Sequence, residues 1–344
     1  MILKFHAQVQ FIKGYLRTAI YDLPRKEYDF MPNEVYNQLK KIENHEKDLI
    51  YKICSEDELN WLNFLLKKEY VFFVPSSFKN NFPKIDFEWK TSSLITNAVV
   101  DIDHLQKEFV FKFLENLNCK HIALNFSFGM NFKKLKFFYE TNLSKLTFNS
   151  ISFFFPIGSV SEKDFSNYIS IANNIHIVDF LPKRDKSDVF VPQFVLGINS
   201  FSESLEHNLY FNRKIRVSSN NGVFNGLEGD INYNKSNSLN SEDDLIKIIN
   251  ESEISKLWNV KKDDIDVCKD CEFRYMCIDN RILENRYVNS YYSLKECSYN
   301  PYISKWSNDK DFLSLKECGV IVNEKGIEVD FDKISSLNVA LWGK

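Results

Sequence analysis

Long uninterrupted apolar segments are missing from this chain of 344 residues. The first residues contain no apolar core of signal-peptide length, and the longest uncharged stretch, residues 146–160, includes a proline, a glycine and several hydroxyl side chains. A membrane-spanning helix needs about 20 consecutive apolar residues, and a secretory signal needs an apolar core. We therefore expect a cytoplasmic protein that has no membrane partner.

Neither sign of charge is in large excess. The chain has 44 basic and 47 acidic residues, a net charge of −3, and no run of like charge long enough to form a tail. Proteins that bind nucleic acids usually carry a strongly basic surface. We expect no nucleic-acid partner.

The motifs of several common enzyme classes are absent. The sequence contains no Gly-x4-Gly-Lys, Gly-x-Gly-x2-Gly or Gly-x-Ser-x-Gly, and its six histidines are not spaced as a ligand set. The glycine motifs bind nucleotide phosphates or present a catalytic serine. Neither nucleotide phosphate binding nor serine hydrolysis is therefore supported.

Cysteine is scarce, but it is unevenly distributed. Four of the seven cysteines lie in one short stretch, at Cys268, Cys271, Cys277 and Cys297. A Cys-x2-Cys turn lets two thiolates converge on one metal, and two further thiolates complete a tetrahedral set. We predict that these four side chains bind one metal centre; the alternatives are four unrelated core residues or a disulfide pair. An odd number of cysteines without a secretory signal indicates a reducing compartment, where thiols bind metal.

The residues leave the identity of the metal open. Thiolate-only ligation suits both zinc and an iron–sulfur cluster, and the spacing alone favours structural zinc. Cys318 is either an alternative to Cys297 as fourth ligand or a buried thiol. Arg274 and Arg281 flank the metal loop, and we expect them to donate to sulfurs or to acidic side chains.

Three regions follow one another along the chain. Residues 1–82 show the pattern of three strands, two helices and a closing strand, which is typical of a small winged-helix module. Residues 83–215 alternate between strands and helices, and their continuously apolar strands favour a parallel sheet that forms part of a β/α barrel. Residues 216–344 begin with a loop rich in Asn, Ser and Gly and continue into the cysteine region.

The expected elements can be placed by number. In the first region they are strands 5–13, 15–23, 28–31 and 70–74, with helices after Pro32 and after the capping box Ser55–Glu58. In the second region they are strands 95–102, 121–126, 145–155, 175–180 and 190–197. Asp101 and Asp103 beside His104 are either a small polar site or a solvated strand end.

The cysteine region resembles a known domain. The spacing Cys-x2-Cys-x5-Cys, with Arg-Tyr-Met before Cys277 and Ser-Tyr-Asn-Pro-Tyr after Cys297, is similar to the SPASM domain of radical S-adenosylmethionine peptide maturases. Segments 14–23, 95–103, 210–214 and 317–321 extend the similarity over nearly the whole chain, to the SPASM maturases of grasp-with-spasm systems and to related pseudo-radical-SAM proteins. The resemblance implies two partners: a ribosomally made precursor peptide and an ATP-grasp ligase.

The chain departs from the wider SPASM pattern at defined positions. Gly222 fits the glycine position, but Leu227 stands where the next cysteine is expected, and Arg281 replaces another. In the family, the missing ligands hold the first auxiliary cluster, whereas Cys268, Cys271, Cys277 and Cys297 correspond to the complete set for the second. The resemblance therefore implies one [4Fe–4S] cluster, with Zn²⁺ as the alternative.

The catalytic cluster of the family is also missing. Residues 83–267 contain only Cys119, so the Cys-x3-Cys-x2-Cys motif is absent. Without that cluster, S-adenosylmethionine has no iron site to coordinate and no source of electrons for its cleavage. We expect a degenerate partial barrel with no S-adenosylmethionine-binding cluster, and whether the protein is an enzyme stays open.

The expected fold is therefore α/β, with a winged-helix-like peptide-recognition module at 1–82, a degenerate partial radical-SAM-like barrel at 83–215 and a SPASM-like domain with one metal site at 216–344. The resemblance implies that a precursor leader adds as a strand to the edge of the first module, beside a helix. The candidate peptide-binding residues, each of which has core packing as its alternative, are Tyr28, Phe30, Met31, Leu59, Leu62 and Leu66.

Three functions are compatible with these features. The first is an accessory maturation protein that binds the leader and acts with the ATP-grasp ligase. The second is a maturase enzyme that uses the barrel and the remaining cluster on the same peptide. The third is a metal-stabilised scaffold without peptide binding.

Overall fold

The computed structural model describes residues 1–103, 108–156, 159, 175–178, 189–226, 229, 231–236, 238–287 and 289–343. The chain divides into two compact units. Unit 1 comprises Met1–Trp89, Ser187–Leu209 and Val260–Lys344; unit 2 comprises Lys90–Lys186 and Tyr210–Asn259. The sequence-based division into regions 1–82, 83–215 and 216–344 differs from these two units. It stays a prediction about the domains of the chain. In the described residues, no helix is long and apolar enough to cross a membrane.

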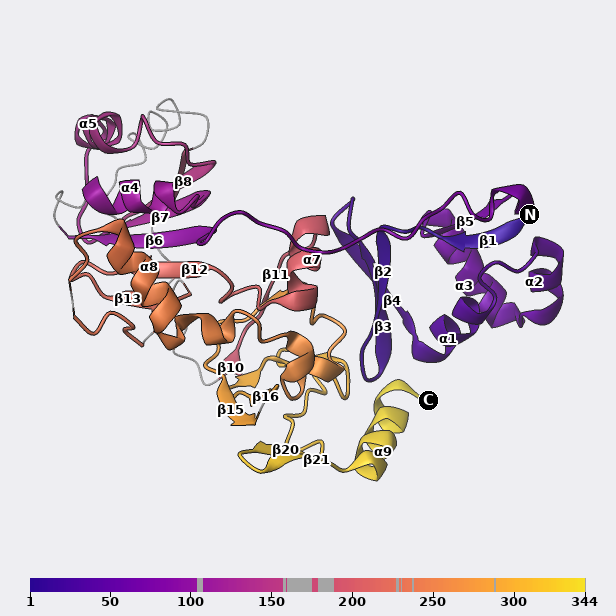
Figure 1. Ribbon diagram of the computed structural model, residues 1–344. Helices are drawn as coiled ribbons and strands as arrows, with labels where there is room; N and C mark the ends of the chain where they lie inside the picture. The colour runs from indigo at the N-terminus through magenta and orange to yellow at the C-terminus, as the bar shows by residue number, and fades with distance from the viewer. Residues whose placement is uncertain are drawn as a thin grey trace. The chain divides into compact units, whose positions relative to one another are not determined.

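Unit 1 contains a three-stranded antiparallel sheet near the N-terminus. Its strands are β2 (Val9–Lys13), β3 (Arg17–Asp22) and β4 (Glu27–Pro32), in the order β2-β3-β4 (Figure 1). The expected strand 5–13 is in fact two strands, because β1 (Ile2–Phe5) pairs with β5 (Val71–Val74) instead. A turn closed by the hydrogen bond from the Val9 amide to the His6 carbonyl separates them.

Three helices belong to this part of unit 1. The expected helices are confirmed as α1 (Asn33–Lys41) and α3 (Glu56–Lys67), and α2 (Lys47–Ile53) was not anticipated. The predicted capping box begins α3: the Ser55 hydroxyl accepts from the Glu58 amide, and the Glu58 carboxylate accepts from the Ser55 amide at 2.7 Å. These reciprocal bonds satisfy amide groups that a helix cannot pair internally.

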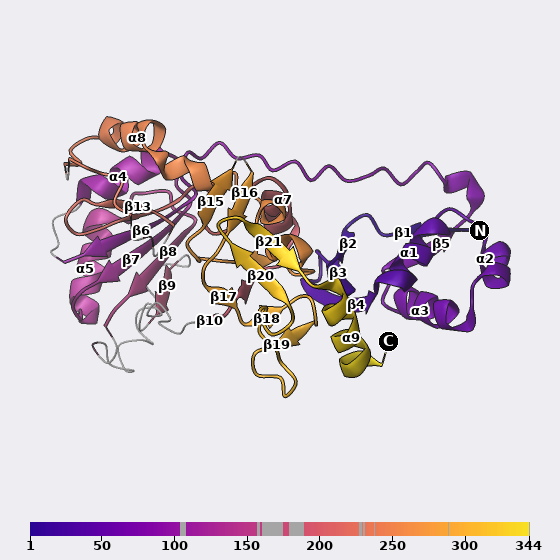
Figure 2. The same ribbon diagram turned by 90° about the horizontal axis from the view of Figure 1, so that it is seen from below.

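Successive side chains of a strand point to opposite faces of the sheet. Apolar residues of this sheet are buried on both faces. Ile20 and Met31 are buried with the residues of α1 and α3. Ala19 and Tyr21 point the other way and are buried with Phe201 and Phe273. The sheet thus lies between helices α1 and α3 and a second layer that includes α7 (Ile198–Glu206) (Figures 1 and 2).

The cysteine region of unit 1 is built from short strand pairs. Two of them involve residues expected to form one strand of the parallel sheet at 190–197, and that expectation is wrong. Val189–Phe190 (β10) pairs with Glu296–Cys297 (β17), and Gln193–Phe194 (β11) pairs with Cys277–Ile278 (β14). Pro192 lies between β10 and β11, and since proline has no amide hydrogen it interrupts a strand.

The remaining elements of unit 1 complete this region. They are the hairpins β15 (Glu284–Tyr287) with β16 (Ser290–Tyr292), β18 (Tyr299–Asn300) with β19 (Lys305–Trp306) and β20 (Val320–Asn323) with β21 (Gly326–Val329), followed by α9 (Phe331–Trp342). Tyr302, Val320 and Ile334 form a small core under α9.

Unit 2 is built around a six-stranded sheet of order β13-β12-β6-β7-β8-β9. Its members are β6 (Asn97–Ile102), β7 (His121–Phe126), β8 (Ser150–Phe154), β9 (Ile175–Val178), β12 (Lys214–Val217) and β13 (Val223–Asn225). All neighbours are parallel except β12 and β13, so the expected parallel sheet is confirmed. Residues 179–180 of the expected fourth strand lie outside the described residues.

Aromatic rings fill the core of unit 2. Phe126 on β7 stacks on Phe155 with ring centroids 5.0 Å apart and meets the edge of Phe138 at 5.6 Å. The α-helices of this unit within its described residues are α4 (Glu108–Asn116), α5 (Phe132–Asn142) and α8 (Glu242–Glu251), and α4 packs against α8. The fold is therefore mixed α/β.

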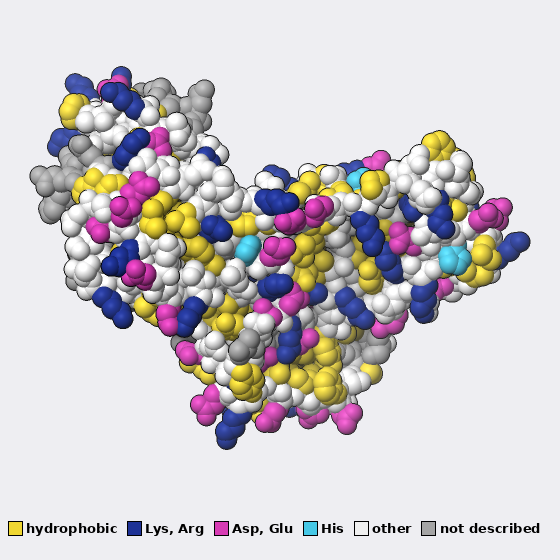
Figure 3. Space-filling view, viewed as in Figure 1, with side chains coloured by type: hydrophobic (Ala, Val, Ile, Leu, Met, Phe, Trp, Pro, Cys, Tyr) yellow, Lys and Arg dark blue, Asp and Glu magenta, His cyan; other side chains and the backbone are white. Residues whose placement is uncertain are grey.

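Charged side chains of both signs are spread over the face drawn in Figure 3. Among the described residues seen there, neither the basic nor the acidic side chains form a continuous patch (Figure 3).

A glycine between β2 and β3 gives a test of the packing in unit 1. A methyl group at Gly14 would lie 2.8 Å from the backbone nitrogen of Glu272, which is closer than packed carbon and nitrogen atoms approach. We expect Gly14→Ala to lower the free energy of unfolding by about 1–3 kcal/mol, measured by chemical denaturation. Lys13→Ala is the control, because that side chain is exposed and should change the value by less than about 0.5 kcal/mol. Equal effects of the two substitutions would contradict this account.

Candidate metal centre

Short turns and strand pairs position the four clustered cysteines. Cys268 begins a single 3-10 turn (Cys268–Asp270), and Cys271 ends it, with the Cys271 amide donating to the Cys268 carbonyl at 3.0 Å. Cys277 lies on β14 and Cys297 on β17, each fixed by pairing with the 189–194 segment. All seven cysteines of the chain are free thiols.

The four predicted ligands line one small cavity. Cys268, Cys271, Cys277 and Cys297 all contribute to its wall, and its volume is about 30 Å³. One water molecule needs roughly 10–15 Å³, so the space suffices for a single ion. The structure thus brings together side chains that are up to 29 positions apart in the sequence (297 minus 268).

Cys318 occupies a different environment. It is fully buried and does not line this cavity. Its sulfur accepts a hydrogen bond from Asn300 Nδ2 at 3.3 Å. Between the two sequence-based interpretations of Cys318, a buried thiol and a fourth ligand, this geometry favours the buried thiol.

Burial keeps three of the cavity thiols protonated in the absence of a cation. It raises the pKa of Cys271 and of Cys277, and it raises the pKa of Cys297 to about 11. Neighbouring thiols act in the same direction, because two thiolates close together repel. A bound metal would have to displace these protons, since thiolate is the form that ligates.

Buried cations stand beside the thiols. The Arg281 guanidinium donates to Cys268 Sγ at 3.3 Å and forms an ion pair with Asp279 at 2.7 Å. Lys262 Nζ lies 2.5 Å from the same carboxylate. These three side chains are at most 8% exposed, and Lys262 and Arg281 both line the cysteine cavity. The expectation that Arg281 donates to a sulfur and to an acidic side chain is confirmed.

The charges around the cavity do not balance without the sulfurs. Two buried cations, Lys262 and Arg281, share one buried carboxylate, that of Asp279, which leaves one excess positive charge. Burial opposes the charged form of Lys262, but Asp279 and the thiols Cys268 and Cys277 outweigh it and raise its pKa above the ordinary value. An anionic tetrathiolate–metal centre is the kind of group that such an excess stabilises.

The donor set fits a thiophilic metal or an iron–sulfur cluster, since it consists of four thiols and no oxygen ligand. No group of three or more His, Cys, Asp or Glu side chains stands arranged to hold a metal ion within the part of the chain that the structure describes. The case for a metal therefore rests on the shared cavity, the donor chemistry and the neighbouring charges, and not on a preformed ligand geometry.

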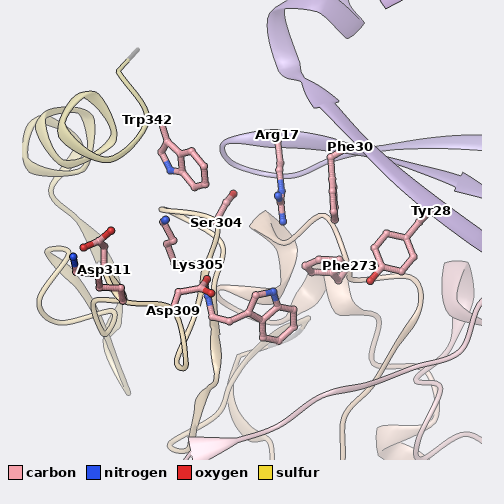
Figure 4. Close-up of a pocket in the computed structure, with 11 residues that line it drawn as sticks. Arg17, Tyr28, Phe30, Phe273, Ser304, Lys305, Asp309, Asp311 and Trp342 are labelled. Atoms are coloured by element: carbon pink, nitrogen blue, oxygen red, sulfur yellow. The ribbon is translucent and has the colours of Figure 1, made fainter. Parts of the chain in front are cut away.

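The six candidate peptide-binding residues do not form one surface. Met31 and Leu62 are 2% and 0% exposed and belong to the core, while Leu59 and Leu66 pack against that core and are partly buried. Tyr28 and Phe30 lie on the opposite face of β4, where their rings meet edge to face at 5.5 Å. Both side chains line a cavity (Figure 4). Phe273 contributes to the wall of this cavity and to that of the cysteine cavity.

The polar group at the end of β6 is internally paired. Asp101 accepts from Asn125 Nδ2 at 2.9 Å and lies 3.0 Å from Arg216 Nε. Asp103 is exposed. His104 and Leu227 lie outside the described residues.

Comparisons with protein-family models, with curated proteins and with solved structures find no match for this chain. The similarity to SPASM proteins is therefore carried by the residues quoted for it alone.

Several residues at the two cavities are not marked by any local sequence pattern. Lys262 and Asp279 carry ordinary charges in an ordinary sequence context, and only the fold buries them together. Glu272 follows Cys271 directly, and a carboxylate inside a cysteine motif is a local sign of a buried ion pair.

Replacing one cavity thiol tests the ligand assignment. We expect Cys271→Ser to lower the metal content per chain to less than about half and to lower the melting temperature, because three thiolates hold an ion less well. Metal analysis of purified protein and thermal unfolding measure the two effects. Cys119→Ala and Cys318→Ala are controls that should keep their metal. Unchanged metal in Cys271→Ser would show that this thiol is not a ligand.

Removing the buried cation tests the charge argument. We expect Arg281→Gln to speed metal loss to a chelator and to weaken metal affinity by about 10–100-fold. Lys269→Gln removes the same charge one residue from Cys268, but Lys269 pairs with Asp266 at 2.8 Å and does not line the cavity. Competition titrations should separate the two variants, and equal weakening would mean that only net charge matters.

Proposed function

We propose that this protein is an accessory maturation protein of a ribosomal peptide system. It binds the leader of a precursor peptide with the N-terminal module, residues 1–82, and acts together with an ATP-grasp ligase. The cysteine site holds one metal centre, a [4Fe–4S] cluster or Zn²⁺, that stabilises the C-terminal region. Radical S-adenosylmethionine chemistry is not part of this function.

The free edge of β4 is the observation that carries the proposal. Among the described residues, β4 pairs with β3 alone, so one side of its backbone has no strand partner. Tyr28 on this strand is 42% exposed. An extended peptide can add to such an edge through main-chain hydrogen bonds, while pockets for alternate side chains supply specificity.

The surroundings of β4 support a module of the winged-helix kind. Three antiparallel strands lead directly into α1, because Pro32 ends β4 and Asn33 begins the helix. Asn33 is buried and its side-chain amide donates to the carbonyls of Gly14 and Tyr15, both at 3.1 Å. These bonds connect the β2–β3 turn to the start of α1, so the sheet can accept a strand without losing its shape.

The sequence supports the absence of S-adenosylmethionine cleavage, as the cysteines for its cluster are missing from residues 83–267. If incubation of the protein and the precursor with S-adenosylmethionine and a reductant releases 5′-deoxyadenosine, the alternative of a maturase enzyme is correct.

Peptide binding is tested with synthetic leader segments of ribosomal precursor peptides. We expect a fluorescently labelled leader to bind saturably, and Tyr28→Ala to weaken binding at least about tenfold, as truncation of an aromatic anchor does. The matched control is Tyr51→Ala, because Tyr51 is 44% exposed but lies on α2. Fluorescence anisotropy measures both. No binding by the wild-type protein would refute the proposal.

A further inference from the structure

A larger cavity opens beside β4. It has a volume of about 450 Å³, within the range of ligand pockets, and residues of β3, β4 and the 273–342 segment line it. All of these residues belong to unit 1. The side chains of Arg17, Ser304 and Lys305 project toward a common space in the close-up (Figure 4).

Arg17 is held rigidly at this cavity. Its Nε pairs with the buried carboxylate of Glu272 at 2.6 Å, and its Nη2 donates to the Tyr299 hydroxyl at 3.2 Å. Its guanidinium carbon lies 3.6 Å from the centre of the Phe30 ring. The remaining terminal nitrogen, Nη1, has no hydrogen-bond partner among the described residues, so it is available to a ligand.

Ser304 and Lys305 add two further donors. Ser304 is 5% exposed, and its hydroxyl has no hydrogen-bond partner in the described structure. Its backbone has φ of +50°, a left-handed conformation that is uncommon for serine. The Lys305 ammonium lies 4.4 Å from the centre of the Trp342 ring and forms no ion pair within the described residues. A buried donor without a partner is costly, so a ligand oxygen would relieve it.

The cavity wall also carries two acidic residues, Asp309 and Asp311, and a further cation, Lys310. Asp309 is already engaged, since one of its carboxylate oxygens accepts from the Trp306 amide at 2.7 Å. Asp311 is exposed. Phe30, Phe273 and Trp306 supply an apolar wall beside the donors, and charge-assisted hydrogen bonds to a carboxylate are stronger beside such a wall than in water.

We propose that this cavity binds a carboxylate carried by the peptide that pairs along β4. The carboxylate accepts hydrogen bonds from Arg17 Nη1, the Ser304 hydroxyl and the Lys305 ammonium. An acidic side chain or a free C-terminus offers the same chemistry. The inference rests on the proposed function, because Tyr28 and Phe30 belong both to β4 and to the cavity wall.

The preference for a carboxylate is tested by passing a random dodecapeptide library over the immobilised full-length protein. One half of the library has amidated C-termini and the other half has free C-termini. We expect the bound peptides to share an Asp or Glu at one position, or to need the free terminus. In a selected peptide, replacing the shared Asp or Glu by its amide, or amidating the required C-terminus, should weaken binding at least about tenfold. Lys305→Met and Ser304→Ala should weaken the acidic peptide and leave its neutral counterpart within twofold. Lys316→Met, an exposed lysine away from the cavity wall, is the control.

The possible outcomes separate the two proposals. If peptides bind but acidic and neutral versions bind equally, the cavity assignment is overturned and the proposed function stands. If neither a library peptide nor the leader binds, the proposed function fails, and N-acetylphenylalanine is then compared with N-acetylphenylalaninamide by tryptophan fluorescence, to which Trp306 and Trp342 of the cavity wall contribute. A saturable response to the acid alone, lost in Lys305→Met, supports the carboxylate site, whereas equal responses overturn it.

Discussion

A buried carboxylate ties the cysteine loop to the N-terminal sheet. Glu272 is fully buried, pairs with Arg17 on β3 and accepts from Tyr299, while its backbone carbonyl accepts from the Tyr21 hydroxyl at 2.6 Å. Because Glu272 directly follows Cys271, each of these contacts also fixes the loop that carries a candidate ligand. Breaking a buried pair by removing one partner typically costs several kcal/mol, about 3–5. The position of the cysteine cavity and the alignment of Arg17 at the larger cavity therefore depend on the same side chain.

Both cavities place cationic side chains beside a site for an anionic group. Around the cysteines, Lys262 and Arg281 leave a positive excess that suits anionic sulfur. At the larger cavity, Arg17 is neutralised on one edge by Glu272, and its other edge, with Ser304 and Lys305, presents donors to the solvent side. In both places a buried acid orients a guanidinium, and the unused donors define what kind of group can bind. Arg281, which lies within this cysteine region, takes part in that charge balance through Asp279 and the Cys268 sulfur.

Local sequence signals predicted local structure well here. The capping box at Ser55, the turn at Gly14 and the apolar strand 121–126 all lie where their residues indicated. Errors arose where a distant partner decides the outcome. Val189–Phe194 is rich in apolar residues, but Pro192 divides it. Its first half pairs with a strand 107 residues further along the chain and its second half with one 83–85 residues further, separations that no local pattern encodes. The burial of Lys262 with Asp279 belongs to the same class, since only tertiary packing brings the two together.

The sheet β2–β4 has consequences for how the protein can be divided. Its outer face is completed by residues that follow it by some 180 to 280 positions, including Phe201, Phe273 and Tyr299. A fragment that ends near residue 82 would leave Ile12, Ala19, Tyr21 and Phe30 uncovered, and an apolar sheet face in water promotes self-association. The packing of this sheet is thus complete only when the last third of the chain has been synthesised, which couples the folding of the N-terminal sheet to the presence of the cysteine region.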